Sequence, residues 1–189
     1  MVAVESQMLA LGTEAPAFSL PDPEGQQHSL ADEASAFLVM FICNHCPFVK
    51  HVREELARIG RDYAARGVAI YAINSNDINK HPSDSPDNMK IEAETWGYTF
   101  PYLFDESQQV AQAYRAACTP DFYVFDADKR LTYRGQLDDS RPSNARPVDG
   151  HDLRAALDAV LESNPPPSEQ KPSIGCNIKW APGNEPDYF

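Results

Sequence analysis

A pair of cysteines directly follows an apolar run that has the length of a strand. This feature limits the folds that the chain can adopt more than any other. Residues 36–42 (AFLVMFI) form an unbroken apolar run, which is typical of a strand buried on both faces. The next residues read Cys43-Asn44-His45-Cys46, and a helical pattern of apolar side chains covers Cys46–Arg66. Pro47 suits the first turn of that helix. The cysteine pair is therefore expected where a central strand meets a helix.

The rest of the chain alternates between strand-like and helix-like segments. Strands are expected at 68–73, 102–104, 122–125 and 131–133, the last two as a hairpin, and helices at 85–96, 107–114 and 152–161. Strands and helices that alternate and end in a hairpin and a helix predict an α/β fold. The sheet is expected to be mixed, with helices on both faces.

A proline-rich segment follows this body. The pattern predicts a domain over residues 1–163 and an arm over 164–189, where six prolines fall in 26 residues. Such a composition predicts neither a helix nor a central strand. The arm still carries Ile174, Ile178, Trp180 and Tyr188, which is enough apolar surface to pack on the domain.

Composition excludes several classes of partner. Sixteen Lys and Arg against 28 Asp and Glu give a net charge of −12, which repels nucleic acid and anionic membranes. No apolar run approaches the roughly 20 residues that span a bilayer. The first residues lack the basic stretch of a signal peptide, so a cytoplasmic location is expected. Cysteines in such a compartment are more often reactive or metal-binding than structural.

The pair Cys43 and Cys46 has the spacing of a dithiol that forms a disulfide. The first cysteine is expected at the helix N-terminus, where unpaired N–H groups and the helix dipole stabilise a thiolate. Cys43 would then attack a disulfide, and Cys46 would resolve the mixed disulfide. His45 between them would tune the couple. Half of a zinc site and two inert buried thiols are the alternatives, but no second Cys-x-x-Cys accompanies the pair.

The order of motifs resembles that of the thioredoxin superfamily. The apolar strand, the CNHC motif and its helix are followed by Cys118-Thr119-Pro120 and the strand DFYVFD. The resemblance implies that Pro120 is a cis-proline and that Thr119-Pro120 faces the disulfide. Residues 12–20 are similar to the start of peroxiredoxins and TlpA-type proteins. Together with INSND, QLDDSRP and GCNIKWAPGNEP, they resemble a peroxiredoxin-like group of that superfamily.

Two departures from these families affect the expected chemistry. Peroxiredoxins carry Pro-x-x-x-Thr-x-x-Cys, whereas Cys43 holds the threonine position if Cys46 is aligned with their cysteine. Peroxidase activity is therefore the alternative to thiol–disulfide exchange as the predicted function. Thioredoxin-type sites often use a buried carboxylate, and strand 36–42 has no ionisable group. The nearest candidate is Asp121, for which an ordinary solvated position at a strand end is an equal alternative.

The two remaining cysteines have open roles. Cys118 stands two residues before Pro120 and is expected to be a buried, hydrophobe-like thiol near the site. Cys176 in the arm is either an auxiliary resolving thiol for the CNHC motif or the partner of Cys118 in a second bridge. His28, His81 and His151 belong to no motif and are expected on the surface.

The sequence thus predicts a thiol–disulfide oxidoreductase of thioredoxin-like fold that exchanges electrons with a dithiol protein or a small thiol. No organic cofactor is expected, because the sulfurs carry the electrons. A hypothesis of another class is a metal-binding or metal-delivering protein that uses Cys43, Cys46 and a histidine, which resembles copper-assembly members of the superfamily. The oligomeric state stays open.

Overall fold

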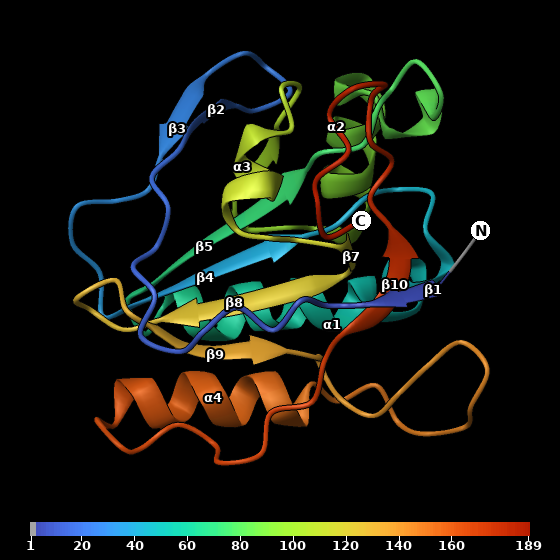
Figure 1. Ribbon diagram of the computed structural model, residues 1–189. Helices are drawn as coiled ribbons and strands as arrows, with labels where there is room; N and C mark the ends of the chain where they lie inside the picture. Colours follow the sequence, from blue (N-terminus) through green and yellow to red (C-terminus); the bar gives the residue numbers. More distant parts are fainter. Residues whose placement is uncertain (1–2) are drawn as a thin grey trace.

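A five-stranded mixed sheet is built around the apolar run that precedes the cysteine pair (Figure 1). In the computed structural model, which describes residues 3–189, this run is β4 (Ala36–Phe41), and all six of its residues are buried. The strand order is β6-β5-β4-β8-β9. β4 lies between β5 (Val68–Asn74) and β8 (Asp121–Phe125), and the outer strands are β6 (Tyr102–Phe104) and β9 (Leu131–Gly135). β5 and β6 run parallel to β4, and β8 runs antiparallel to both β4 and β9.

Helices cover both faces of this sheet. One apolar cluster joins the sheet to α1 (Pro47–Ala64), α2 (Pro86–Trp96) and α4 (His151–Leu161). A second cluster joins the other face to α3 (Gln109–Ala113) and to segments near both chain ends. A short 3-10 helix, η1 (Pro82–Asp84), precedes α2. The predicted α/β class and each predicted helix and strand of the body are confirmed, with ends that differ by a few residues.

The C-terminal segment contains a strand that the sequence analysis does not predict. β10 (Ile174–Asn177) is the middle strand of a three-stranded antiparallel sheet, between β1 (Ala3–Glu5) and β7 (Cys118–Thr119). The expectation that this segment forms no central strand is wrong, because its prolines all lie outside these four residues. Their N–H groups are therefore free to pair on both sides. Near the N-terminus, β2 (Ser19–Pro21) and β3 (Gln27–Ser29) form a small hairpin.

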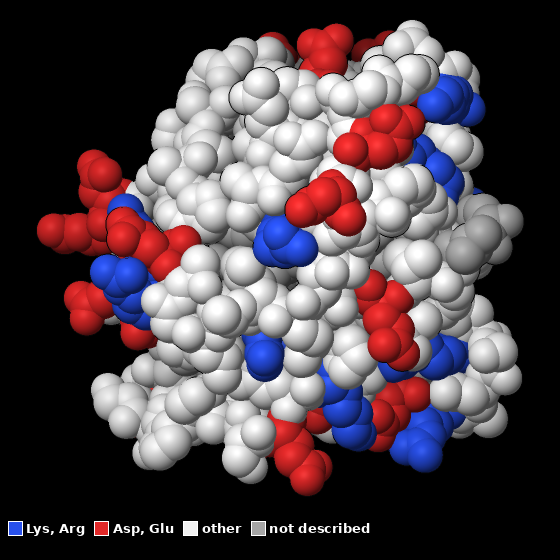
Figure 2. Space-filling model, in the orientation of Figure 1, with Lys and Arg blue, Asp and Glu red and all other residues white. Residues whose placement is uncertain are grey.

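The residues after β10 continue onto the second apolar cluster. Ile178 and Trp180 are buried there, and the hydroxyl of Tyr188 donates to the carbonyl oxygens of Ala111 and Ala116. None of the helices within residues 3–189 has the length and apolar character needed to cross a bilayer. On the face shown in Figure 2, acidic and basic side chains are interspersed over a larger uncharged area.

Candidate active site

The CNHC motif forms a turn between the carboxyl end of β4 and the start of α1. The helix begins at Pro47, and Cys46 is its N-cap, with an extended backbone conformation. Its carbonyl oxygen accepts the N–H of Lys50, which is the first hydrogen bond of the helix. The expectation that Cys43 stands at the helix N-terminus is therefore corrected. Proline lacks an N–H and fits the first helical position, so it places Cys46 at the positive end of the helix dipole.

Three sulfurs meet next to Thr119. The Sγ of Cys46 lies 2.8 Å from the Sγ of Cys176 and 3.2 Å from the carbonyl oxygen of Thr119. The Sγ of Cys43 lies 3.3 Å from Oγ1 of Thr119 and 3.9 Å from Nδ1 of His45. All three cysteines are at most 2% exposed. The chain thus brings a cysteine of the C-terminal segment into direct contact with the motif.

The surroundings of the three sulfurs shift their pKa values in different directions. Hydrogen bonds with the thiols of Cys176 and Cys43 lower the pKa of Cys46, and they outweigh its burial. Burial raises the pKa of Cys43 well above the ordinary value. Its hydrogen bond with Cys46 and its burial raise the pKa of Cys176. Of the three, only Cys46 has its pKa lowered by its surroundings.

A buried carboxylate, that of Asp84, binds the turn formed by the CNHC motif. Oδ1 of Asp84 accepts the backbone N–H groups of Asn44 and His45, at 2.9 and 3.1 Å. Its Oδ2 lies 2.5 Å from Nδ1 of His45 and accepts a hydrogen bond from Asn76. Burial alone would raise the pKa of Asp84, but the hydrogen bonds from His45 and Asn76 hold it below the usual value. The carboxylate therefore orients His45 and anchors the backbone between the two cysteines.

Sequence reasoning misses Asp84 and the second histidine of the site. Asp84 lies in η1, 39 residues along the chain from His45, and no motif marks it. The ring of His81 stacks on that of His45, with centroids 4.6 Å apart. The expectation that His81 is merely a surface residue is wrong, because this stacking makes it part of the site. Only the fold brings these positions together, since η1 follows the strand next to β4.

The Thr119–Pro120 peptide bond is cis, as the resemblance to thioredoxins implies. Thr119 contacts Cys43 through its hydroxyl and Cys46 through its carbonyl oxygen. Pro120 follows directly and leads into β8. The predicted residues Cys43, His45, Cys46 and Thr119 thus lie within one group of contacts.

Cys118 and Asp121 belong to the other side of the sheet. Asp121 is completely buried, shares a face with Tyr123 and accepts a hydrogen bond from its hydroxyl. Burial raises the pKa of Asp121 to about 8. A solvated strand-end position is therefore excluded for this residue. Tyr123 packs in the cluster of α3, whereas Cys46 packs in that of α1.

The register of the small sheet separates Cys118 from Cys176. Cys176 is paired with Thr119, and Cys118 is paired with Asn177. Because neighbouring residues of a strand point to opposite faces, the side chains of Cys118 and Cys176 point away from each other. Cys118 instead lies near carbonyl oxygens of Pro120 and Ser173. A bridge between Cys118 and Cys176 does not fit this arrangement.

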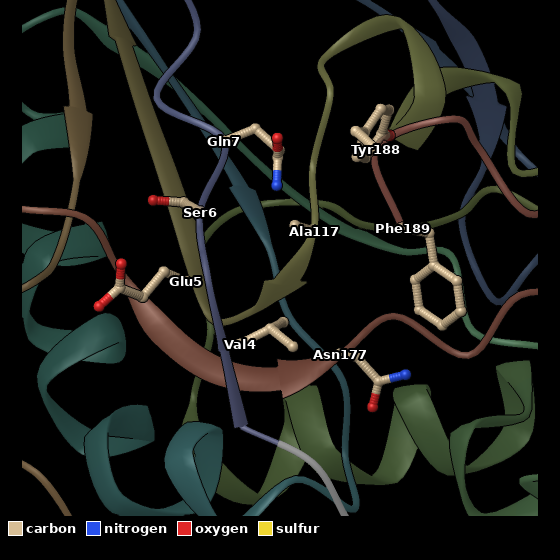
Figure 3. A pocket seen from close by; sticks show the side chains of 8 residues that line it. All are labelled: Val4, Glu5, Ser6, Gln7, Ala117, Asn177, Tyr188 and Phe189. Atoms are coloured by element: carbon tan, nitrogen blue, oxygen red, sulfur yellow. The ribbon is translucent and has the colours of Figure 1, made fainter.

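A hollow of about 680 Å³ lies next to the small sheet (Figure 3). Val4 of β1, Asn177 of β10 and Phe189 are among the residues that line it. Asn177 points into this hollow, so its neighbour Cys176 points away from it. Within the described residues, no cysteine lines the hollow.

Two residues of the motif and Asp84 together have the side-chain chemistry of a metal site. The ligand atoms of Cys43, His45 and Asp84 lie within 4.8 Å of one another. This set differs from the sequence hypothesis, which uses both cysteines and a histidine. Nδ1 of His45 is engaged with Asp84, so an ion would have to replace the hydrogen bond that orients the ring.

Comparison with known proteins places this site in a family. The model of the AhpC/TSA family matches residues 11–134, which is more than half of the chain. The chain belongs to the AhpC/TSA family. The matched part includes the CNHC motif, Asp84 and Pro120.

Relatives of this AhpC/TSA protein agree with the fold. The thiol-disulfide oxidoreductase ResA of Geobacillus thermodenitrificans is 29% identical over 131 residues, or 67% of this chain and 70% of that protein. An uncharacterized conserved protein of Geobacillus kaustophilus has a crystal structure that is similar with a TM-score of 0.94. It is 59% identical, and the match covers 97% of this chain and 98% of that one.

A more distant structure bears on the fold alone. The thioredoxin domain of a thiol-disulfide oxidoreductase from Bacteroides vulgatus is 18% identical, with a TM-score of 0.59. The match covers 77% of this chain and 96% of that domain. The predicted thioredoxin-like fold is thus confirmed for this member of the AhpC/TSA family.

Proposed function

We propose that this protein is a thiol–disulfide oxidoreductase in which Cys46 is the attacking sulfur. The observation that carries the proposal is the position of Cys46, at the N-cap of α1 and in contact with a second thiol at 2.8 Å. Helix N-termini and thiol donors both stabilise a thiolate. The class of activity is also the one named for the relative ResA.

The roles of the two motif cysteines are thereby reversed from the sequence prediction. The thiolate of Cys46 attacks a disulfide of the partner, forms a mixed disulfide and releases one partner thiolate. Cys43, which starts as a thiol, then loses its proton to the released thiolate and attacks Cys46. The second partner thiolate leaves. The partner disulfide has then been reduced by two electrons, and the protein has been oxidised to the Cys43–Cys46 disulfide.

His45 and Asp84 act on this chemistry as positioning residues. Asp84 fixes the backbone N–H groups of the turn and the ring of His45, whose Nδ1 lies 3.9 Å from the sulfur of Cys43. A rigid turn keeps the sulfurs in line for attack, which lowers the entropic cost of the reaction.

The partner supported by this chemistry is a dithiol protein or a small thiol. A surface of net charge −12 favours partners that are not strongly acidic. We propose a cytoplasmic location, where glutathione and thioredoxin-type dithiols supply electrons. Neither step of the cycle needs an organic cofactor.

The proposal is tested by single-turnover reduction of oxidised glutathione by the pre-reduced protein. Cys46→Ser is expected to lower the rate at least a hundredfold, because the attacking sulfur is removed. Cys118→Ser, a buried thiol on the other face, is the matched control and should react like the wild type.

Disulfide reduction by Cys46→Ser at the wild-type rate would overturn the proposal. Stopped-flow mixing with hydrogen peroxide separates the alternative activity. Oxidation of Cys46 by peroxide far faster than that of free cysteine, with no turnover of disulfides, would make the protein a peroxidase instead.

A further inference from the structure

Cys176 is a sulfur outside the CNHC motif that nevertheless touches its reactive cysteine. Its Sγ lies 2.8 Å from that of Cys46, although the two residues are 130 positions apart in the sequence. Both are buried, with exposed fractions of 2% and 0%. A disulfide has an S–S distance of about 2.05 Å, so the two sulfurs need to approach by less than about 1 Å to reach bonding distance.

The strand that carries Cys176 is fitted closely to the site. Cys176 pairs with Thr119 across β10 and β7, and the same Thr119 contacts the sulfurs of Cys43 and Cys46. The preceding residue is Gly175, and any side chain there would collide with the carbonyl oxygen of Thr119. Glycine at this position allows the backbones of β10 and β7 to approach, which brings the Cys176 sulfur against Cys46.

Two thiols lie beside Cys46, and the contacts among the three sulfurs shift their acidities in opposite directions. A hydrogen bond joins the sulfurs of Cys46 and Cys176, and this contact raises the pKa of Cys176 and lowers that of Cys46. Cys43 is likewise a thiol of raised pKa beside the same sulfur. Cys46 therefore has two neighbouring thiols, one in the motif and one in the C-terminal strand.

We infer that Cys176 is a third redox sulfur, which competes with Cys43 to form an internal disulfide with Cys46. The inference rests on the proposed function in one respect, namely that Cys46 is the sulfur that attacks the partner. Cys118 is excluded from this role, because the register of β7 and β10 turns its side chain to the other face.

Each step balances without a further reactant. After Cys46 has formed a mixed disulfide with the partner, the proton of Cys176 passes to the partner thiolate released first. The Cys176 sulfur then attacks that of Cys46 and expels the second partner thiolate. The Cys46–Cys176 bond forms as the mixed disulfide breaks. Attack of Cys43 on Cys46 can later exchange this bond for Cys43–Cys46 and release Cys176, with no net oxidation.

The Cys43–Cys46 and Cys46–Cys176 disulfides would link different parts of the fold. A Cys43–Cys46 bond closes a short loop within one turn. A Cys46–Cys176 bond ties the C-terminal strand β10 to the start of α1, over a site whose sulfurs are already shielded from solvent. The choice between Cys43 and Cys176 therefore decides whether β10 is covalently locked over Cys46.

The test uses the full-length chain carrying Cys118→Ser, so that only the three sulfurs of the site remain. In this background Cys43→Ser leaves Cys46 and Cys176. The reduced protein is mixed with 5,5′-dithiobis(2-nitrobenzoic acid), and the intact mass and a peptide map are recorded over time. We expect a transient adduct on Cys46 that disappears, a final mass two hydrogens below that of the reduced chain, and a peptide joining Cys46 to Cys176.

The matched variant Cys43→Ser/Cys176→Ser should keep a stable adduct on Cys46. A stable adduct on Cys46 in Cys43→Ser itself, with Cys176 still open to alkylation, would overturn the inference while leaving Cys46 as the attacking sulfur. Adduct formation only on Cys176, with none on Cys46, would overturn the proposed function instead.

A second measurement avoids the Cys43 substitution altogether. The Cys118→Ser chain, oxidised by one equivalent of the same reagent, should yield both the Cys43–Cys46 and the Cys46–Cys176 peptides. Adding Cys176→Ser should leave Cys43–Cys46 alone. Absence of the Cys46–Cys176 peptide from the Cys118→Ser chain throughout the reaction would contradict the competition between the two thiols.

Discussion

At the scale of single residues, two cysteines three positions apart have opposite surroundings. Cys46 caps a helix, and hydrogen bonding with two other thiols lowers its pKa, whereas Cys43 is buried beside a hydroxyl and near the carboxylate of Asp84. The first environment stabilises a negative charge and the second opposes it. Asp84 has a further effect, because its two oxygens hold the backbone and the histidine of the turn.

Replacing Asp84 by Ala is expected to destabilise the fold by about 2–6 kcal/mol. The substitution leaves the N–H groups of Asn44 and His45 buried without an acceptor, and such groups cost about 1–3 kcal/mol each. Urea unfolding measures the loss. Asp87→Ala, an exposed acid in the first turn of α2, should cost less than about 1 kcal/mol. Equal losses for the two variants would show that the contacts of Asp84 do not support the turn.

At the scale of elements, the site depends on a strand added from the far end of the chain. β10 pairs with β1 on one side and with β7 on the other, and it covers the cysteines of the motif. Only two residue pairs join β10 to β7. Because Cys46 has no exposed surface, a partner's sulfur reaches it only after the surrounding segments move, and we expect this short pairing to be the one that opens.

Gly175→Ala should therefore expose Cys46. The added methyl group collides with the Thr119 carbonyl oxygen, so β10 must move away from β7. We expect alkylation of Cys46 by iodoacetamide to become at least tenfold faster, with the site of alkylation identified by peptide mapping. Asn177→Ala is the control on the same strand, since its side chain faces the hollow. An unchanged alkylation rate in Gly175→Ala would mean that β10 does not control access.

At the scale of the whole molecule, most charged side chains lie on the surface, but a few carboxyl groups are buried. The chain has a net charge of −12, yet Asp121 is completely buried between the sheet and the second apolar cluster. Its pKa of about 8 in the folded state compares with an ordinary value of 3.8, so the folded protein holds this proton more tightly than the unfolded chain. Proton binding at Asp121 thus favours folding.

The sign of the pH dependence follows directly. The contribution of Asp121 to stability is fully present below about pH 4 and is lost as the pH rises through about 8. Over this interval the free energy of unfolding should fall by up to about 1.4 kcal/mol per pH unit from this group. Asp121→Asn keeps the shape but has no titrating proton, and urea unfolding at several pH values should show that its stability relative to the wild type rises with pH. Parallel pH profiles for the two proteins would contradict the buried titration.

Much of the body could be predicted from local sequence patterns. The run 36–42, the helix after Cys46 and the hairpin near 122–133 all have apolar periodicities that depend only on neighbouring residues. β10 escaped prediction because a four-residue strand has little pattern of its own and is stabilised by pairing with β1 and β7. The same reasoning failed for Asp84, whose partners His45 and Asn44 are distant in sequence.

The sequence by itself determined that this chain builds an α/β sheet and places two thiols where a central strand meets a helix. It also predicted that sulfur chemistry takes place there. Only the tertiary structure decided that Cys46 caps the helix, that Asp84 holds the turn and that Cys176 touches Cys46. The physical reason is that acidity and proximity depend on burial and on contacts between residues far apart in the chain, and these exist only once the chain is folded.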